Sequence, residues 1–202
     1  MAATRPAGAA RFDRDYYRRY YLDPRTAVNS REDMRRLARF IAAYLGYLDL
    51  PVRRILDAGC GCGWLRTPFS KLLPSAAYTG LEFSDYLCRR YGWTQGSLDH
   101  YVARRPFQLI VCNGVLQYLR DGQAARALAN LARLSDGVLY FNALTSEDWT
   151  SNADRQRTDG DVRLRPARWY RARLQRSFLE IGAGLWLRRG LGIPLWRLER
   201  AP

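Results

Sequence analysis

ILDAGCGCGWL, residues 55–65, is the stretch of sequence that decides the fold class of this chain. An apolar run ends in Asp57, and glycines then occupy every second position at Gly59, Gly61 and Gly63. The apolar run before the turn predicts a strand, and the helical spacing of apolar residues after it predicts a helix. Glycine tolerates positive φ and carries no Cβ, so a ligand can lie against the backbone and the start of the helix. The stretch therefore predicts a nucleotide-binding turn between a strand and a helix.

A second carboxylate, Glu82, ends the next predicted strand, which lies within YTGLEFS at residues 78–84. It follows the glycine turn by about 20 residues, the spacing at which an acid in a doubly wound sheet accepts hydrogen bonds from ribose hydroxyls. The G-x-G-x-x-G fingerprint of dinucleotide-binding proteins is absent, because Arg66 stands where its third glycine would be. A nicotinamide-dependent oxidoreductase is therefore a disfavoured alternative.

These residues resemble the class I S-adenosylmethionine-dependent methyltransferases, whose first motif is an acid-x-G-x-G-x-G turn. The resemblance continues in order through QGSL at residues 95–98, the adenine-side loop, and FQLIVCNGVLQYL at residues 107–119, the fourth strand and its exit. It covers roughly residues 50–145. It implies an α/β fold with a doubly wound, mostly parallel seven-stranded sheet, helices on both faces, a closing antiparallel strand pair and an N-terminal helical cap.

The resemblance also implies S-adenosylmethionine as the cofactor, S-adenosylhomocysteine as the product, and a set of cofactor-binding residues. These are Asp57, Gly59, Cys60, Gly61, Gly63, Glu82, Phe83, Ser97, Leu98, Asn113 and Gly114. Ser97 stands where many relatives carry an acid, with Asp99 two positions on, so the adenine contacts are expected to be weaker than the ribose contacts. The turn NGVL differs from the Asn/Asp-Pro-Pro-aromatic pattern of enzymes that methylate exocyclic nitrogens, which disfavours that subclass.

No catalytic residue is assigned, because methyl transfer from a sulfonium depends mainly on orientation and exclusion of water. Gln117, Tyr118, Glu147 and Asp148 are candidates for the acceptor side, since they follow the fourth and fifth predicted strands. His100, the only histidine, is more consistent with a surface position than with a general base. A non-enzymatic partner subunit that keeps the fold and binds the cofactor is the alternative to an enzyme.

The formal net charge of +14 is concentrated in residues 1–54 and 155–202, on either side of a neutral centre. Such basic flanks favour an acidic or nucleic-acid acceptor or partner. Alternatively, they reflect GC-rich coding, because Lys71 is the only lysine among the 33 basic residues. No nucleic-acid-binding module is recognisable, so a small-molecule acceptor is slightly favoured.

Length and composition predict one domain with a sizeable core. Its predicted parts are a disordered N-terminus at residues 1–11 and a single domain at 12–202, made of a helical cap (12–50), a cofactor-binding core (51–145) and an acceptor-side and closing segment (146–202). No apolar run approaches the roughly 20 residues of a membrane span, and the first ten residues lack a signal-peptide core. A cytoplasmic protein without membrane contact is expected, and the sequence does not indicate its oligomeric state.

Four cysteines and one histidine lack the spacing of a zinc site, so no metal is expected and the thiols are interpreted as packing residues in a reducing compartment. Tyr20, Tyr21 and Arg25 are candidates for a lid over the cofactor, although packing of the cap is the simpler explanation. Further elements are predicted as helices at 12–22, from Ser30 to Leu48, and at 64–73, 85–91, 98–103, 122–134 and 168–179, and as strands at 93–95, 138–142, 181–187 and 193–198.

Overall fold

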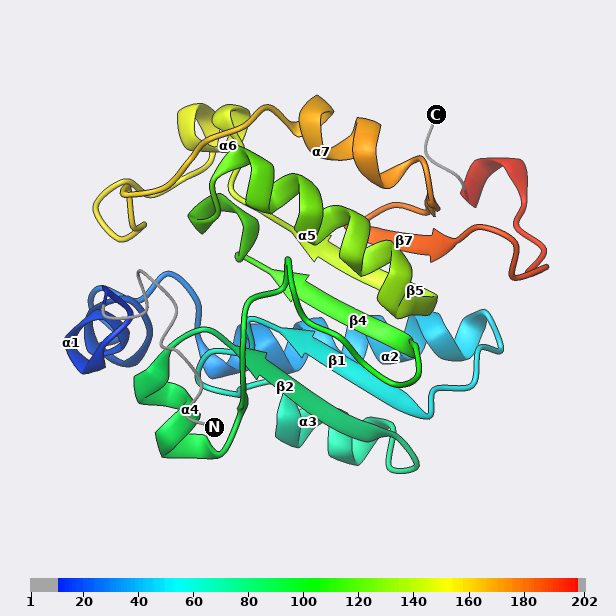
Figure 1. Ribbon diagram of the computed structural model, residues 1–202, viewed down its shortest axis with the longest axis horizontal. Helices are drawn as coiled ribbons and strands as arrows, with labels where there is room; N and C mark the ends of the chain where they lie inside the picture. The colour runs from blue at the N-terminus through cyan, green and yellow to red at the C-terminus, as the bar shows by residue number, and fades with distance from the viewer. Residues whose placement is uncertain (1–10, 200–202) are drawn as a thin grey trace.

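A computed structural model of the chain describes residues 11–199 (Figure 1). The predicted disordered segment 1–11 lies outside the described residues, except for Arg11. Seven strands form one sheet in the order β3-β2-β1-β4-β5-β7-β6. They are β1 (Arg54–Ala58), β2 (Ala77–Glu82), β3 (Thr94–Gln95), β4 (Phe107–Asn113), β5 (Ser135–Asn142), β6 (Phe178–Glu180) and β7 (Leu185–Arg188).

The strands from β3 to β5 run parallel, and β7 runs antiparallel to both β5 and β6. The mostly parallel seven-stranded sheet with a closing antiparallel pair is thus confirmed. Parallel strands that are covered on both faces are continuous apolar runs, and Leu109, Ile110 and Val111 of β4 are fully buried. The strand order reverses between β1 and β4, and sheets of this kind bind ligands at the carboxyl ends of the strands beside that point.

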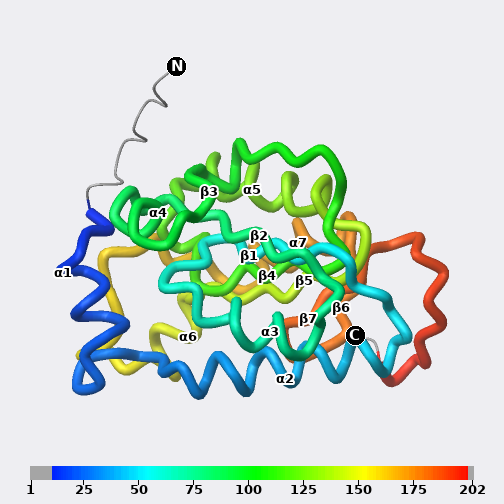
Figure 2. The backbone as a smooth tube through the Cα atoms, turned by 90° about the horizontal axis from the view of Figure 1, so that it is seen from below, coloured from blue at the N-terminus to red at the C-terminus, as the bar shows by residue number. Residues whose placement is uncertain are grey.

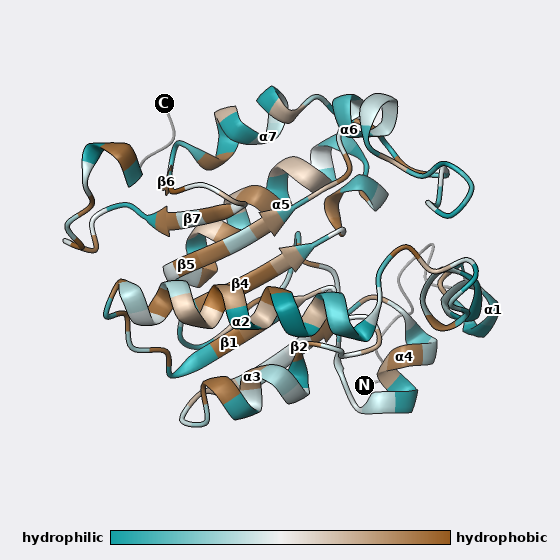
Figure 3. Cartoon of the chain, turned by 180° about the vertical axis from the view of Figure 1, so that it is seen from behind, coloured by the Kyte–Doolittle hydropathy of each residue, from teal (hydrophilic) through white to brown (hydrophobic). Residues whose placement is uncertain are grey.

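Helices cover both faces of the sheet (Figure 2). One layer consists of α2 (Arg31–Tyr47) and α3 (Arg66–Leu72), and the other of α4 (Asp85–Tyr91), α5 (Asp121–Leu134) and α7 (Ala167–Leu174). A capping box between Ser30 and Asp33 starts α2, as the sequence predicts. Seen from the α2 side, β4 and β5 are largely hydrophobic, whereas α2 and α3 carry both polar and hydrophobic residues (Figure 3).

Within residues 12–50, only the part before α2 lies over the edge of the sheet. The helix α1 (Arg14–Tyr17) continues directly into a π-helical turn, η2 (Arg18–Leu22), and Figure 1 places α1 at the carboxyl ends of the parallel strands. In contrast, Ala38, Ile41 and Leu45 of α2 are buried in a hydrophobic cluster with residues of β1, β4 and α3. Thus α2 is one of the helices that cover the sheet.

The closing strands differ from the prediction. Helix α7 ends at Leu174, and the pair is formed by β6 and β7; residues 193–196 have no regular structure and lead into the 3-10 turn η4 (Arg197–Glu199). The chain reverses at Gly182, Ala183 and Gly184, where φ is +90°, +49° and +80°. Glycine adopts such values without steric cost, so this segment turns tightly enough to let β7 bury Leu185 and Leu187 against the sheet.

The short helix predicted at residues 98–103 is also wrong, because the segment makes only a single turn at 98–100. The side-chain amide of Asn130 donates to the carbonyl oxygens of Leu98 and Tyr101 at 2.7 and 2.8 Å. These carbonyl groups are therefore bonded to α5 and not to a following helical turn. Among the described residues, none of the helices combines the length and apolar composition needed to cross a membrane.

Residues 145–165 form a long excursion that contains α6 (Ser146–Ser151) and is closed at its base by Arg165. The guanidinium of Arg165, a residue only 4% exposed, donates to the carbonyl oxygens of Leu116 and Leu119, the hydroxyl of Tyr170 and the carboxylate of Asp121. The 3-10 turn η3 (Leu116–Tyr118) and the start of α5 are thereby tied to the end of the excursion.

Arg165→Met is expected to destabilise the protein by about 3 kcal/mol, because it removes every hydrogen bond of the buried guanidinium, including its bond to the carbonyl oxygen of Leu119. For a chain of this size, the loss corresponds to a decrease of about 10 °C in the melting temperature, measurable by circular dichroism. Arg163→Met is the matched control, since Arg163 is exposed and two residues away. Equal melting temperatures for the two variants would contradict the structural role of Arg165.

Candidate functional site

The glycine turn lies at the carboxyl end of β1 and is held in place by β2. The backbone N–H groups of Gly59 and Cys60 both donate to the carbonyl oxygen of Leu81, at 2.7 and 3.1 Å. Gly59, Gly61 and Gly63 all have positive φ, at 77°, 53° and 69°. Side chains rarely adopt this backbone region, so the alternating glycines satisfy the geometry of the turn.

The three glycines meet different surroundings. A Cβ at Gly59 would lie 2.3 Å from Cγ2 of Val115, and one at Gly63 would lie 2.3 Å from the ring of Trp93. A Cβ at Gly61 would meet nothing closer than the carbonyl oxygen of Gly59, at 4.0 Å. Two glycines thus permit packing inside the protein, whereas Gly61 leaves its space open.

Trp93, just before β3, supports the turn from behind. Its Nε1 donates to the carbonyl oxygen of Gly61 at 3.0 Å, and its ring occupies the space beside Gly63 and Gly80. The sequence predicts only that Trp93 belongs to a strand. Gly63 in the turn and Gly80 in β2 were the available signal, because a glycine in each of two neighbouring elements leaves room for one large side chain to pack against both.

Glu82 is 6% exposed and fixed by backbone donors. Its Oε1 accepts from the N–H groups of Phe83 and Ser84, and its Oε2 accepts from the N–H of Gly61, each at 2.8 Å. Burial raises the pKa of Glu82, while these N–H groups favour its ionised form. A buried carboxylate therefore stands directly against the glycine turn, with one further lone pair on Oε2 free of the backbone.

Two cavities meet at the turn. The first, here called the Glu82 cavity, has a volume of about 210 Å³ and is lined by Glu82 together with Phe83, Ser97 and Leu98. The second, the Asp57 cavity, has a volume of about 490 Å³ and extends from Asp57 along the exits of β4 and β5 to the 145–165 excursion. Both include Gly59, Gly61 and Gly114 in their walls.

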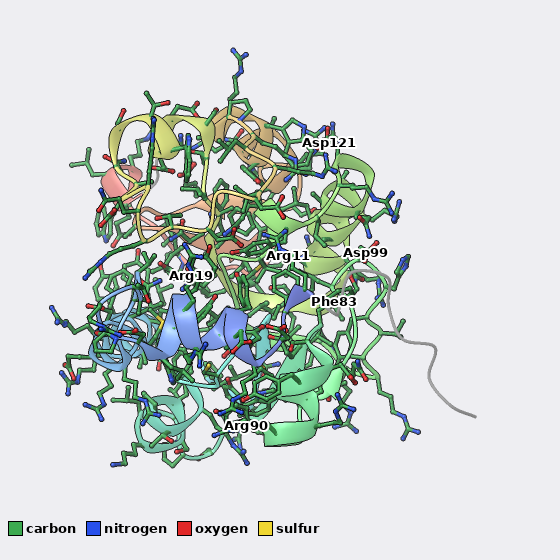
Figure 4. All side chains as sticks on the ribbon, turned by 90° about the vertical axis from the view of Figure 1, so that its left-hand side faces the viewer. Arg11, Arg19, Phe83, Arg90, Asp99 and Asp121 are labelled. Carbon is green, nitrogen blue, oxygen red and sulfur yellow. The ribbon has the colours of Figure 1, made fainter. Side chains whose placement is uncertain are left out.

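Aromatic residues of α1 and η2 cover these cavities. The hydroxyl of Tyr17 donates to Glu82 at 3.5 Å, and the hydroxyls of Tyr16 and Tyr118 lie 2.9 Å apart. Tyr16 and Tyr21 line both cavities. Figure 4 looks onto this edge of the sheet, with Arg11 and Phe83 labelled near its centre.

A family model described as a methyltransferase domain matches residues 29–191. The chain belongs to this methyltransferase family. The match spans the glycine turn, Glu82 and both antiparallel closing strands. No curated protein sequence matches this methyltransferase.

Solved structures show the same fold at low sequence identity. The sugar N-methyltransferase KedS8 from Streptoalloteichus sp. ATCC 53650 is 18% identical, with a TM-score of 0.60 over 75% of this methyltransferase and 86% of that chain. The N-methyltransferase NodS from Bradyrhizobium japonicum WM9, in complex with S-adenosylhomocysteine, is 19% identical, with a TM-score of 0.53 over 75% of this methyltransferase and 87% of that chain. The amino pentose methyltransferase CalS10 from Micromonospora echinaspora, bound to S-adenosylmethionine, is 13% identical, with a TM-score of 0.55 over 77% of this methyltransferase and 91% of that chain.

The structure brings most of the predicted cofactor-binding residues of the methyltransferase together around the two cavities. The exception is Gly63, which lines neither cavity and faces Trp93 instead. The remaining ten line at least one: Asp57, Gly59, Cys60, Gly61, Glu82, Phe83, Ser97, Leu98, Asn113 and Gly114.

Ser97 is oriented by Asp99, which is itself buried. The Ser97 hydroxyl donates to Asp99, and the same carboxylate accepts from Arg126 at 2.9 Å. The hydroxyl oxygen of Ser97 is thus left to accept a hydrogen bond in the Glu82 cavity. Asp99 does not line that cavity, so its role is to position Ser97.

The lid and acceptor-side candidates divide into two groups. Tyr20, Tyr21, Gln117, Tyr118 and Asp148 line the Asp57 cavity. Arg25, Glu147 and His100 line neither cavity: Arg25 pairs with Asp23, Glu147 accepts from the N–H of Ala167, and the exposed His100 lies beside Asp99. Tyr16 and Tyr17 were not singled out, although their spacing within the tyrosine-rich helix was visible. Over the described residues, no cluster of His, Cys, Asp or Glu could hold a metal ion.

Asp57 is 4% exposed and accepts a hydrogen bond from the hydroxyl of Tyr78 on the neighbouring strand. Burial raises the pKa of Asp57 to about 7, with a further contribution from Glu82, while the bond from Tyr78 acts in the opposite direction. A carboxylate that titrates near neutral pH therefore lines the Asp57 cavity beside the glycine turn.

Proposed function

We propose that this methyltransferase uses S-adenosylmethionine and transfers its methyl group to a small polar acceptor. The observation that carries the proposal is the geometry of Glu82, which three backbone N–H groups hold against an open glycine turn. The residues fit the cofactor, because Gly61 leaves room for a ligand and Glu82 supplies an ionisable acceptor for ribose hydroxyls. When bound, the cofactor supplies an electrophilic methyl group on a sulfonium.

The chain's own residues then have distinct parts. Glu82 accepts from the ribose, Phe83 and Leu98 provide apolar walls for the adenine, and the Ser97 hydroxyl accepts from its amino group. Asp57 attracts the amino-acid end of the cofactor with its charge. The tyrosines of α1 and η2 exclude water, which strengthens the electrostatic interactions in the site.

Support for a small acceptor comes from the size of the Asp57 cavity, about 490 Å³, and from the residues of η2 and of the 145–165 excursion that line it. KedS8, a sugar N-methyltransferase, and CalS10, an amino pentose methyltransferase, have the same fold. The cytoplasmic location and the division into cap, core and acceptor-side segment stay predictions.

The test is ligand-dependent stability followed by turnover. A ligand at about 100 times its dissociation constant adds about 2.7 kcal/mol, so S-adenosylmethionine and S-adenosylhomocysteine should raise the melting temperature and a nicotinamide dinucleotide should not. Methyl transfer to any acceptor of a small-molecule collection would then establish the enzyme. Cofactor binding without turnover on any acceptor would favour the non-enzymatic partner subunit, and absence of cofactor binding would refute the proposal.

Ionisation of Asp57 predicts that S-adenosylhomocysteine binds about fivefold more tightly at pH 8 than at pH 6. Protonated Asp57 has no charge with which to attract the ligand's ammonium group, and its carboxylate forms as the pH rises through about 7. In the free protein the raised pKa of Asp57 lowers the free energy of unfolding as the pH rises from 3.8 to about 7, because Asp57 ionises in the unfolded chain before it ionises in the folded one. Above about pH 7 this loss of stability is complete.

Isothermal titration calorimetry across this pH range measures the effect. In Asp57→Asn, the increase in affinity between pH 6 and pH 8 should disappear. Tyr78→Phe should move its midpoint to higher pH, because the hydrogen bond that favours the carboxylate is lost. An unchanged pH profile in Asp57→Asn would show that another group is responsible.

A further inference from the structure

The Asp57 cavity has a charge opposite to that of the protein. The chain carries a formal net charge of +14, with 33 arginines and lysines. Yet the residues that line this cavity include four aspartates, Asp57, Asp148, Asp154 and Asp159, and no arginine, lysine or histidine. An anionic acceptor would therefore lie among carboxylates, whereas a cationic one would be attracted.

The four carboxylates differ in whether an arginine already neutralises their negative charge. Asp159 pairs with Arg11 at 2.7 Å, and Asp154 lies 3.9 Å from Arg157. Asp57 lies beside the glycine turn, where the amino-acid end of the cofactor is proposed to bind. Asp148 is the remaining one, and no described residue forms an ion pair with it.

Asp148 is held in place by neutral donors only. Its Oδ2 accepts from the hydroxyl of Thr145 at 2.6 Å, and its Oδ1 accepts from the amide of Asn152 at 2.9 Å. These hydrogen bonds lower the pKa of Asp148, so the group stays ionised at neutral pH. A fixed negative charge thus borders the cavity at the start of α6.

Gln117, another side chain of the same cavity, has an acceptor to which no described residue donates. Gln117 is only 7% exposed, and its Oε1 has no hydrogen-bond partner among the described residues. A buried amide oxygen without a partner is unfavourable, and a ligand N–H group would satisfy it. Asn113, Asn142 and Tyr20 also line this cavity and add polar, uncharged groups to it.

We infer that the acceptor is an amine on a neutral polar scaffold, bound through Asp148 and Gln117. This inference rests on the proposed methyl transfer and specifies its substrate class. The ammonium form binds beside the Asp148 carboxylate and releases one proton to water before reaction. The nitrogen lone pair then forms the new N–C bond, the C–S bond breaks with its electron pair going to sulfur, and the product is a methylated ammonium ion with a neutral thioether.

The charge of the cavity and the charge of the basic flanks favour acceptors of opposite sign. The flanks favoured an acidic acceptor, whereas the cavity next to the glycine turn favours a cation. Asp148 and Gln117 are accordingly assigned to specificity, and the arginine-rich outer surface has no part in this assignment.

The test measures binding of matched fragments to the full chain saturated with S-adenosylhomocysteine. Two triplets serve as probes: glucosamine, glucose and glucuronate, and cyclohexylamine, cyclohexanol and cyclohexanecarboxylate. Ligand-observed NMR titration should show at least tenfold tighter binding of the amine than of the alcohol or the acid in at least one triplet. Asp148→Asn should remove most of this preference, and Gln117→Leu should weaken amine binding.

Glu147→Gln is the matched control, because Glu147 neighbours Asp148 on α6 but is exposed and lines neither cavity. It should preserve the preference for amines. Equal affinities within both triplets, tighter binding of the acids, no binding of any probe, or an unchanged preference in Asp148→Asn would each overturn the inference. Saturation with S-adenosylhomocysteine is established first by thermal shift, so failure of cofactor binding is distinguished from failure of the acceptor assignment.

Discussion

Replacing Glu82 by glutamine is expected to weaken S-adenosylhomocysteine binding by about 100-fold. A hydrogen bond to a charged acceptor contributes about 1.5 to 3 kcal/mol. The ribose would lose its bond to the remaining lone pair of Oε2, and at the upper end of this range the loss corresponds to about 100-fold in affinity. The substitution also turns an N–H₂ group towards one of the backbone donors that the carboxylate accepts, at Gly61 or at Phe83 and Ser84. Two donors cannot share a hydrogen bond, so the turn loses part of its support as well.

Isothermal titration calorimetry gives the affinity, and far-UV circular dichroism shows whether the variant is folded. Glu32→Gln is the control: it makes the same chemical change on an exposed face of α2, in a carboxylate that pairs with Arg35. Its affinity should equal that of the wild type. If folded Glu82→Gln bound S-adenosylhomocysteine as tightly as Glu32→Gln, Glu82 would not be the ribose ligand and the proposed cofactor site would be wrong.

Alanine substitutions at Gly61 and Gly63 are expected to affect different properties: the first lowers mainly the affinity for the cofactor, and the second lowers the stability of the fold. Gly61→Ala should destabilise the free protein by only about 1 kcal/mol, the cost of positive φ for a residue with a Cβ, because its methyl group meets no other atom within contact distance. That methyl group would stand where both cavities meet. Cofactor affinity should therefore fall by about 100-fold while the fold persists.

Gly63→Ala should instead destabilise the protein by about 2 to 4 kcal/mol, because its Cβ would lie 2.3 Å from the Trp93 ring. The same ring holds the carbonyl oxygen of Gly61, so displacing it disturbs the turn. Urea unfolding measures the stability, and calorimetry of the folded fraction measures the affinity. Equal destabilisation by the two substitutions, or retention of full affinity by Gly61→Ala, would contradict the different roles assigned to these glycines.

Local sequence signals were sufficient where neighbouring residues determine the structure. The capping box of Ser30 and Asp33, the boundaries of α4, and the strand-turn-helix around Gly59 and Gly61 all follow from short-range patterns. The closing strands were misplaced because two glycine-rich stretches, 182–184 and 190–192, both permit a reversal. Pairing of β7 with β5 selects the first, and that contact joins residues far apart in the sequence.

The candidate site shows the same division. Ten of the eleven predicted cofactor-binding residues line the Glu82 cavity or the Asp57 cavity, since the motif records which backbone positions must approach a ligand. Trp93, Asp99 and the tyrosine pair of Tyr16 and Tyr118 act through contacts with other elements, and the sequence around each residue does not identify its partner in such a contact. Gly63 lies against Trp93 and outside both cavities, and its part in cofactor binding stays a prediction.

By itself, the sequence determined the glycine turn, the strands on either side of it and the carboxylate that ends β2, because periodicity, glycine spacing and strand ends are properties of short segments. The arrangement of seven strands in one sheet was implied by the resemblance to methyltransferases. Only the tertiary structure decided which face of the turn is open, which aromatic residues cover it, and that an acidic cavity lies within a strongly basic chain. Net charge sums over all residues without regard to position, whereas the field that a ligand meets depends on which side chains the fold gathers around it.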